Sequence, residues 1–253
     1  MTALLTSVRD AEEAGLALAA GSDWIDLKEP RDGALGRVAP AIARAVVELV
    51  GGRVPVSATI GDCWEAPDCF AARVAGMAAA GVSHVKIGLY ARGLAAPDLA
   101  ALTRATGLGC PLIAVCFAEA PPTARDIATL AAVGLRGVML DTARKKSHAL
   151  RALMSDADLG AFVAAARGHG LLTGLAGRLS LSDVPPLLAL EPDYLGFRSA
   201  LCAGQAREGV LTAEAVAAVK AGIAAYHPPA IASAADLAYR RISSSEARSD
   251  GRA

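Results

Sequence analysis

Residues 23–59 read DWIDLKEPRDGALGRVAPAIARAVVELVGGRVPVSAT, and this stretch contains the unit from which the chain is built. A short apolar run is followed by a polar loop that contains glycine, then by a longer Ala/Val/Leu segment with helical spacing, and then by a second apolar run. Short apolar runs that alternate with helical segments are typical of consecutive βα units. The stretch therefore predicts a strand, a helix and another strand.

The same unit recurs from one end of the sequence to the other. Strands are expected at residues 3–8, 23–27, 54–59, 83–88, 111–116, 136–140, 171–176 and 194–198. Helices are expected at residues 9–20, 40–50, 68–80, 96–106, 122–133, 156–168, 181–189 and 212–225. This regular alternation, without a break in composition, predicts an α/β protein with a single (β/α)8 TIM barrel at residues 1–228.

An open, doubly wound parallel sheet is the alternative arrangement of such units. No G-x-G-x-x-G segment follows the first expected strand, which counts against the dinucleotide-binding form of that sheet. Beyond the barrel, residues 229–253 form a C-terminal extension, which becomes a string of Ser, Arg, Asp and Gly from about residue 243. We expect this polar tail to be mobile and to carry no chemistry.

The composition excludes several classes of protein. The 253 residues include 25 basic and 25 acidic side chains, whereas binding to nucleic acid needs a basic excess. Hydrophobic residues make up 54% of the chain, which excludes a mainly disordered state. Each apolar run is interrupted well before the roughly 20 residues that a membrane span requires. We therefore expect a soluble protein without nucleic-acid or membrane partners, and the apolar content favours a homo-oligomer.

The cysteines and histidines give no indication of a metal site. The five cysteines are odd in number and form no C-x-x-C pair, and no H-E-x-x-H or paired-histidine pattern is present. The sequence also opens without a secretory signal. We expect reduced thiols in a cytoplasmic protein that uses no metal.

Lysine is rare in this chain, which has twenty arginines and only five lysines. Four of the lysines lie at or just after the C-terminal ends of the second, fourth and sixth expected strands: Lys28, Lys86, Lys145 and Lys146. Active sites of TIM barrels are built at that end of the strands. An ordinary solvated loop explains Lys145 and Lys146 equally well, but Lys86 lies between Val85 and Ile87, where a charge is costly without a partner or a function.

The alternation of side chains along each strand predicts which ones meet at the mouth. Alternate residues of a barrel strand face the helices and the lumen, and the last lumen-facing ones stand at the C-terminal opening. Apolar positions such as Ile25 and Ile87 are assigned to the helix side. The remaining parity brings seven polar residues from five strands to one mouth: Asp26, Lys28, Ser57, Thr59, Lys86, Asp141 and Arg198.

A lysine-rich mouth indicates imine chemistry on a phosphorylated substrate. A lysine amine attacks a carbonyl when it is neutral, and burial and neighbouring cations favour that state. Aspartates beside it can transfer protons. Phosphates in barrels are commonly held by the loops after strands seven and eight, which here contain Gly177, Arg198 and Ser199. These residues predict a lysine-dependent lyase or aldolase that acts on a phosphorylated carbonyl compound.

Six segments in this order resemble the (5-formylfuran-3-yl)methyl phosphate synthases. The segments are WIDLKEPRDGALG (24–36), VSATIGD (56–62), HVKIGLY (84–90), MLDTARK (139–145), GLAGRLS (174–180) and GFRSALC (196–202). The resemblance covers about residues 4–225 and implies a carbon–oxygen lyase acting on phosphates. It implies a cofactor-free condensation of two glyceraldehyde 3-phosphate molecules, with loss of one phosphate and two waters, in the biosynthesis of methanofuran-type one-carbon carriers.

The resemblance also implies roles for individual residues. Lys28 is the Schiff-base nucleophile, Lys86 is a general acid and base, and Asp26 and Asp141 are partners in proton transfer. Lys145 helps to hold one phosphate, and the loops of Gly177 and Arg198, with Ser199, hold the other. Strand parity, and not the resemblance, adds Ser57 and Thr59 to the expected substrate-binding set.

The fifth expected strand departs from the family pattern. Phe117 and Glu119 stand where a tyrosine and an aspartate are found in members of the family, which leaves the role of Glu119 open. Two alternative functions remain at this point. One is a class I aldolase that cleaves another small phosphosugar through the same imine, and the other is a non-catalytic barrel that binds a phosphorylated metabolite.

Overall fold

The computed structural model describes residues 1–61, 67–89, 96–143 and 148–226. Eight parallel strands form a closed barrel in sequential order, and β1 pairs with β8 to complete it. The strands are β1 (Ala3–Val8), β2 (Trp24–Leu27), β3 (Val56–Thr59), β4 (His84–Leu89), β5 (Leu112–Phe117), β6 (Gly137–Asp141), β7 (Leu172–Leu175) and β8 (Tyr194–Phe197). The predicted TIM barrel is confirmed. The open doubly wound sheet is wrong, because such a sheet has two unpaired edge strands, whereas every strand here pairs with two neighbours.

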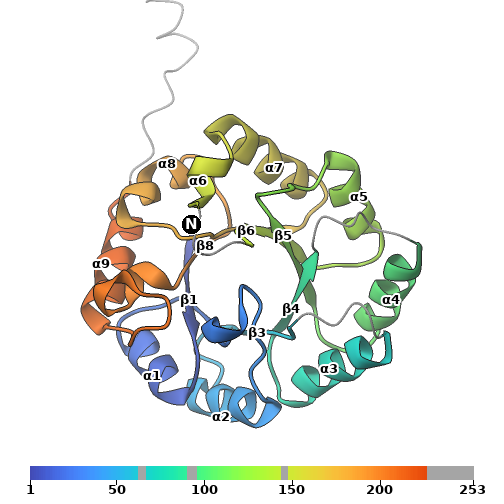
Figure 1. Ribbon diagram of the computed structural model, residues 1–253, viewed down its shortest axis with the longest axis horizontal. Helices are drawn as coiled ribbons and strands as arrows, with labels where there is room; N and C mark the ends of the chain where they lie inside the picture. Colours follow the sequence, from blue (N-terminus) through green and yellow to red (C-terminus); the bar gives the residue numbers. More distant parts are fainter. Residues whose placement is uncertain (62–66, 90–95, 144–147, 227–253) are drawn as a thin grey trace, which may run out of the picture.

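Helices surround the strands as a ring (Figure 1). The α-helices are α1 (Ala11–Ala19), α2 (Pro40–Val50), α3 (Pro67–Ala79), α4 (Ala96–Thr106), α5 (Ala124–Ala132), α6 (Leu150–Leu153), α7 (Asp156–Gly168), α8 (Val184–Leu188) and α9 (Ala213–Ala224). Short 3-10 turns lie in the loops: η1 (Pro30–Asp32), η2 (Leu181–Asp183), η3 (Ser199–Leu201) and η4 (Ala203–Gln205).

Local sequence explains where several of these elements begin and end. Asp10 accepts a hydrogen bond from the Glu13 amide and starts α1, and the Thr123–Asp126 pair forms a capping box at α5. The helix predicted at 181–189 is divided into η2 and α8, because Pro185 and Pro186 have no amide hydrogen to donate to a preceding turn. The short helix α6 and the 3-10 turns were not predicted, since they are too short to show a periodic pattern.

The barrel wall has one layer of hydrophobic side chains on its outer side and another on its inner side. The outer layer packs strand residues such as Ile25 and Ile87 against the helices, as the parity rule predicted. The inner layer fills the lumen with a second cluster, which includes Trp24, Val115 and Tyr194. Small clusters of this kind fill barrel interiors in layers, so the lumen is packed and is not a pore.

The lumen is filled unevenly around its circumference. On the β5 side it is occupied by Val115 and Phe117, which are both buried. On the opposite side, β1 contributes Ser7 and β8 contributes Gly196, and Ala176 follows β7. Because these three side chains are small or absent, space remains beside β7, β8 and β1, and the pocket described below lies there.

Three sequence expectations concern residues outside the described part of the chain. The C-terminal extension at 229–253 lies outside that part entirely, as do Cys63 and the Lys145–Lys146 pair. Within the described part, Cys69, Cys110, Cys116 and Cys202 are free thiols. No helix in that part is both long enough and apolar enough to cross a membrane.

Candidate functional site

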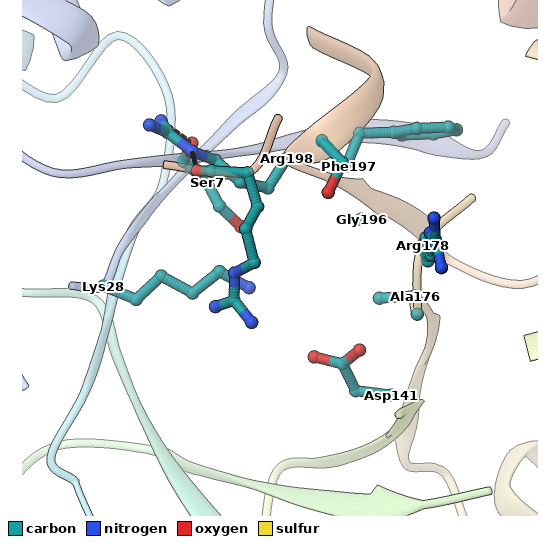
Figure 2. A pocket seen from close by; sticks show the side chains of 11 residues that line it. Ser7, Lys28, Asp141, Ala176, Arg178, Gly196, Phe197 and Arg198 are labelled. Carbon is teal, nitrogen blue, oxygen red and sulfur yellow. Dashed lines mark hydrogen bonds between the residues drawn. The ribbon is translucent and has the colours of Figure 1, made fainter. Parts of the chain in front are cut away.

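A pocket opens at the C-terminal mouth of the barrel (Figure 2). It is lined by residues that follow or end β1, β2, β6, β7 and β8: Ser7, Lys28, Asp141, Ala176, Gly177, Arg178, Gly196, Phe197, Arg198, Ser199 and Arg207. Four of these side chains carry a positive charge and one carries a negative charge. The mouth is therefore suited to an anionic ligand, but three of its four positive charges are arginines, and Lys28 is the one lysine among the described lining residues.

Among the described residues that line this pocket, Lys28 is the lysine. It follows β2 directly, and its amide donates to the carbonyl of Val8 over 3.0 Å, which fixes the start of the loop. Its half-buried side chain extends into the cavity, and the carboxylate of Asp141 projects into the same cavity from β6 (Figure 2). An amine and a carboxylate thus share one cavity, which is an arrangement that can support nucleophilic attack and proton transfer.

Lys86 and Asp26 form a buried ion pair inside the barrel. The Lys86 Nζ lies 2.9 Å from Asp26 Oδ1, and the two side chains are 1% and 3% exposed. Burial lowers the pKa of Lys86, the charge and hydrogen bonding of Asp26 oppose this, and the charge of Lys28 lowers it further. Neither residue lines the pocket, so Lys86 does not reach the cavity that holds the Lys28 amine.

Asp26 is held by two serine hydroxyls. Ser57 donates to Asp26 Oδ1 over 2.6 Å and in turn accepts from the Trp24 indole over 3.1 Å, and Ser7 donates to Asp26 Oδ2 over 3.3 Å. Ser7 also lines the pocket, so it connects the buried pair to the cavity. Ser57 is completely buried. It was predicted to bind substrate, but the structure places it beneath the mouth, as a donor to Asp26.

Thr59 also has a different position from the one predicted. Its hydroxyl donates to the carbonyl of Gly36 over 2.7 Å and lies 3.3 Å from that of Leu27. Gly36 closes the β2–α2 loop, because its carbonyl also accepts a hydrogen bond of 2.9 Å from the amide of Glu29 at the start of the loop. Thr59 therefore fastens the loop that begins at Lys28, and it does not line the pocket.

Aromatic rings lie around the buried lysine. The Lys86 Nζ is 5.4 Å from the centroid of the Tyr194 ring, within the range of a cation–π contact. Trp24 contacts both Tyr194 and His84, with ring centroids 5.1 and 4.8 Å apart. Burial lowers the pKa of His84 to about 4, and the charge of Lys86 adds to this effect. His84 is therefore neutral at pH 7.

The ends of β6 and β7 pack closely at the predicted phosphate loop. Asp141 accepts a hydrogen bond of 2.7 Å from the Thr142 amide. Gly177 has φ +114°, and a Cβ at this position would lie 2.8 Å from Thr142 Cγ2. Both the backbone conformation and the lack of space require glycine here. Arg178 follows in the left-handed region at φ 54°, with its exposed side chain on the rim of the pocket.

The guanidinium of Arg198 has protein acceptors for all five of its N–H groups. It donates to both carboxylate oxygens of Glu13 and to three backbone carbonyls, those of Ser7, Arg207 and Gly209. Burial raises the pKa of Glu13, but hydrogen bonds and charge from Arg198 outweigh it and lower the pKa. Since a guanidinium has five N–H donors, none is left over for a ligand. Arg198 lines the pocket, but its side chain serves as a structural support for the loop after β8.

Phe117 and Glu119, the two departures from the family pattern, have distinct positions. Phe117 is buried in the lumen cluster, where its backbone pairs in register with Asp141. Glu119 lies in the following loop and accepts a hydrogen bond of 3.0 Å from the Ala143 amide. Glu119 therefore helps to hold the loop that follows Asp141.

A second cavity lies outside the barrel. It measures about 570 Å³ and runs between the β5–α5 loop and α7, with mainly apolar walls that include Ile127, Met154 and Phe162. Among the described residues that line it, the ionisable side chains are two carboxylates, Glu119 and Asp158, and none is a lysine. The larger cavity therefore offers no basis for imine or phosphate chemistry, and the mouth remains the candidate site.

A family model described as 4-HFC-P synthase matches residues 4–220. The chain belongs to this family. The resemblance inferred from the six sequence segments is thereby confirmed, and the match includes residues of all eight strands of the barrel. Groups of three or more His, Cys, Asp or Glu side chains that could hold a metal ion are absent from the described part of this 4-HFC-P synthase family member.

Named relatives of this 4-HFC-P synthase family member agree with the assignment. The (5-formylfuran-3-yl)methyl phosphate synthase of Methanosarcina mazei is 35% identical, and the match covers 79% of this chain and 91% of that enzyme. A protein of Methylorubrum extorquens, to which the same activity is provisionally assigned, is 45% identical over 87% of this chain and 92% of its own length. The family membership and these named synthases identify the chain as an enzyme.

Solved structures show the same barrel at lower sequence identity. Phosphoribosyl anthranilate isomerase from Thermus thermophilus aligns with a TM-score of 0.62 and 21% identity, over 88% of this chain and 98% of that one. The 3-hexulose-6-phosphate synthase of Salmonella typhimurium aligns with a TM-score of 0.61 and 14% identity, over 89% and 100%. At these identities the likeness concerns the fold alone.

Three pocket residues with polar side chains were not predicted in this 4-HFC-P synthase family member. Ser7 is the last lumen-facing residue of β1, and the parity rule would have found it had it been applied to that strand. Arg178 and Arg207 lie in loops, where no periodicity indicates the direction of a side chain. Lys145, predicted to hold a phosphate, lies outside the described residues.

Proposed function

We propose that this enzyme condenses two molecules of glyceraldehyde 3-phosphate into (5-formylfuran-3-yl)methyl phosphate, through a Schiff base on Lys28. Two triose phosphates supply the six carbons of the product, and one inorganic phosphate and two waters are released. The observation that carries the proposal is the Lys28 amine in the positively charged mouth of a 4-HFC-P synthase family barrel. Methanofuran-type one-carbon carriers contain such a furan, and their biosynthesis is the proposed context.

Lys28 is the nucleophile in this proposal because its side chain reaches the cavity. Its neutral amine attacks the aldehyde carbon, and loss of water from the carbinolamine gives the imine. The imine withdraws electrons and makes the adjacent C–H bond acidic, so that the resulting enamine can attack the aldehyde of the second triose. Lys86 cannot take this part in the conformation described, since its amine is 1% exposed and paired with Asp26.

Proton transfers are assigned to two carboxylates at different depths. Asp141 projects into the cavity with Lys28 and is placed to move protons at the carbinolamine and the enamine. Asp26 and Lys86 lie deeper and reach the cavity through Ser7, whose hydroxyl donates to Asp26. In this arrangement the buried pair acts as a proton reservoir that communicates with the pocket through one hydroxyl group.

The enclosed part of the pocket is small compared with the proposed substrates. The cavity volume is about 30 Å³. The body of each triose phosphate therefore lies in the open mouth above it. The amide-rich turns at Gly177 and Ser199 and the arginine side chains on the rim face this space and are the proposed phosphate ligands. Lys145 is proposed as a further ligand, as the resemblance implies.

Incubation with glyceraldehyde 3-phosphate alone tests the proposed function. Free phosphate and the ultraviolet absorbance of a conjugated furaldehyde should increase together. An aldol product without phosphate release would support a class I aldolase, and the absence of both signals would refute the synthase assignment.

Borohydride reduction tests the imine and its position. Wild-type enzyme treated with glyceraldehyde 3-phosphate and borohydride should carry a covalent adduct on Lys28, and Lys28→Ala should carry none. Lys28→Arg should also be inactive, because a guanidinium remains protonated. The control is Lys220→Ala, which removes a lysine that pairs with Asp23 and does not line the mouth. Full adduct yield in Lys28→Ala would refute the nucleophile assignment, and no adduct in the wild type would favour a non-catalytic binding protein.

A further inference from the structure

The loop after β8 brings a second arginine to the mouth. Arg207 lines the same cavity as Lys28 and is half-buried there. Its Nη2 donates to the carbonyl of Gly33 over 2.8 Å, and this is the one hydrogen bond of its side chain among the described residues. In contrast to Arg198, whose five donors are all occupied, Arg207 keeps most of its N–H groups for a ligand.

Arg207 is held in place by the side chain of Arg198. The Arg198 Nε donates to the Arg207 carbonyl over 2.8 Å, and its Nη2 donates to the Gly209 carbonyl over 2.9 Å. The loop reverses direction just before this point, where Gly204 and Gln205 adopt left-handed φ angles of 64° and 55°. Arg198 therefore supports the backbone on both sides of Glu208, and the position of Arg207 is built into the fold.

This support extends to helix α1. Arg198 forms an ion pair with Glu13, and both side chains are nearly inaccessible, at 5% and 6% exposure. Arg9 binds the same carboxylate through its backbone amide and its guanidinium. A buried pair of this kind is costly to disrupt, so the chain from Arg9 to Glu13 to Arg198 holds the loop firmly.

The partner of Arg207 on the other side is the loop that carries the nucleophile. Gly33 lies in the β2–α2 loop, which starts at Lys28 and is fastened at Gly36 by Thr59. Arg207 thus connects the β8–α9 loop with the β2–α2 loop across the rim of the cavity. An anion bound to the free N–H groups of Arg207 would lie between these loops and within the cavity that Lys28 lines.

We infer that Arg207 binds the phosphate of the substrate attached to Lys28, and that Arg198 is a positioning residue for Arg207. The inference rests on the proposed function for the identity of the substrate. Its chemical basis is independent of it: a planar guanidinium with free N–H groups, fixed at the edge of a cavity, suits a phosphate dianion. The phosphate assigned to Arg207 is the one that the product keeps, so the contact exists before and during the reaction and contributes to binding more than to the chemical step.

Kinetics of Arg207→Gln test the inference. Loss of a charge-assisted hydrogen bond should raise the KM for glyceraldehyde 3-phosphate by about 10- to 100-fold and leave kcat within about 3-fold. The inhibition constant of inorganic phosphate should rise by a similar factor. Arg207→Lys keeps the charge without the planar fork and should recover part of the loss. Arg31→Gln is the matched control, since Arg31 is exposed in the β2–α2 loop and does not line the pocket.

The positioning role of Arg198 is tested through Glu13. Glu13→Gln should weaken inhibition by phosphate in the wild-type background, because Arg198 loses its ionic anchor. In the Arg207→Gln background the same change should have little further effect on the phosphate inhibition constant. An equal effect in both backgrounds would contradict the positioning role, since Glu13 would then act without Arg207.

Three results would overturn the role of Arg207. They are unchanged KM and phosphate inhibition in Arg207→Gln, an equal effect in Arg31→Gln, and a fall in kcat alone. Direct titration of the wild type and Arg207→Gln with inorganic phosphate, followed by calorimetry, separates this inference from the proposed function, because it needs no turnover. If no furan product forms but Arg207→Gln binds phosphate more weakly than the wild type, only the proposed function fails. If the two bind phosphate equally, or the wild type binds none, the inference fails.

Discussion

Replacing Asp26 by asparagine removes the charge that accompanies Lys86 inside the barrel. The two groups are 2.9 Å apart and almost fully buried. At an effective dielectric constant of about 20, their attraction is about 6 kcal/mol, and desolvation of the two ions offsets much of it. Loss of one partner leaves the other charge buried, which costs about 3–5 kcal/mol. We expect Asp26→Asn to lower the free energy of unfolding by about that amount.

The double-mutant cycle with Lys86→Met isolates the pair. Lys86→Met leaves Asp26 with its hydrogen bonds from Ser57 and Ser7 and should be the milder single change. The variant with both substitutions removes both charges and should lose less than the sum of the single losses, with a coupling energy of about 3 kcal/mol. Urea unfolding at pH 7, followed by circular dichroism, measures all four proteins. Losses that add to within about 0.5 kcal/mol would refute the coupling.

The pH dependence of stability provides a second test of the same pair. Burial lowers the pKa of Lys86 from its usual 10.5, so the unfolded chain binds this proton at a higher pH than the folded protein does. At pH values between the pKa of Lys86 in the folded protein and its pKa in the unfolded chain, proton binding therefore favours the unfolded state. The contribution of Lys86 to stability rises as the pH increases toward 10.5. The stability difference between the wild type and Lys86→Met should grow over this interval. A difference that shrinks as the pH rises would contradict the direction of the pKa shift.

Three further predictions concern the barrel interior and the chemistry. Gly174→Ala places a Cβ 2.2 Å from Tyr194 Cε2, so thermal unfolding should show a loss of about 1–3 kcal/mol or more. Its control, Gly168→Ala, meets no atom within 4 Å and should be neutral or slightly stabilising. Burial lowers the pKa of His84 from 6.5 to about 4 in the folded protein, so stability should fall as the pH decreases between these values. Urea unfolding of His84→Gln should lack that part of the fall. Synthase activity should be unchanged after exhaustive treatment with EDTA, because an imine and proton transfers need no metal; activity restored only by a divalent ion would contradict this.

The barrel itself could be predicted from the sequence because its signal is periodic. All eight strands and the eight principal helices follow from alternating apolar runs and helical spacing, and parity along the strands correctly separated the helix-facing side chains, such as Ile25, from the lumen-facing ones, such as Lys86. Parity also explains why Lys28 and Asp141 share a cavity. These features depend on local backbone geometry, which the sequence reports directly.

The partners of the site residues could not be predicted in the same way. Parity gives the direction of a side chain but not the acceptor that it meets, and these acceptors come from distant loops or helices. Thr59 meets the carbonyl of Gly36, and Arg198 meets the carboxylate of Glu13, 185 residues away. Arg207 was missed for a related reason, because its position depends on turns in the β8–α9 loop and not on a repeating pattern.

The unequal use of lysine and arginine corresponds to two different tasks. Arg198 needs five donors in a fixed plane to hold Glu13 and three carbonyls, and a lysine, with three donors on a single nitrogen, could not make these bonds. Lys28 and Lys86 occupy positions where the proposed chemistry needs a group that can lose its proton, which arginine does not do. Exchanging the two residue types should therefore fail in opposite ways. Arg198→Lys should weaken the loop and phosphate binding while leaving imine formation possible, whereas Lys28→Arg should preserve the charge of the mouth and abolish the imine.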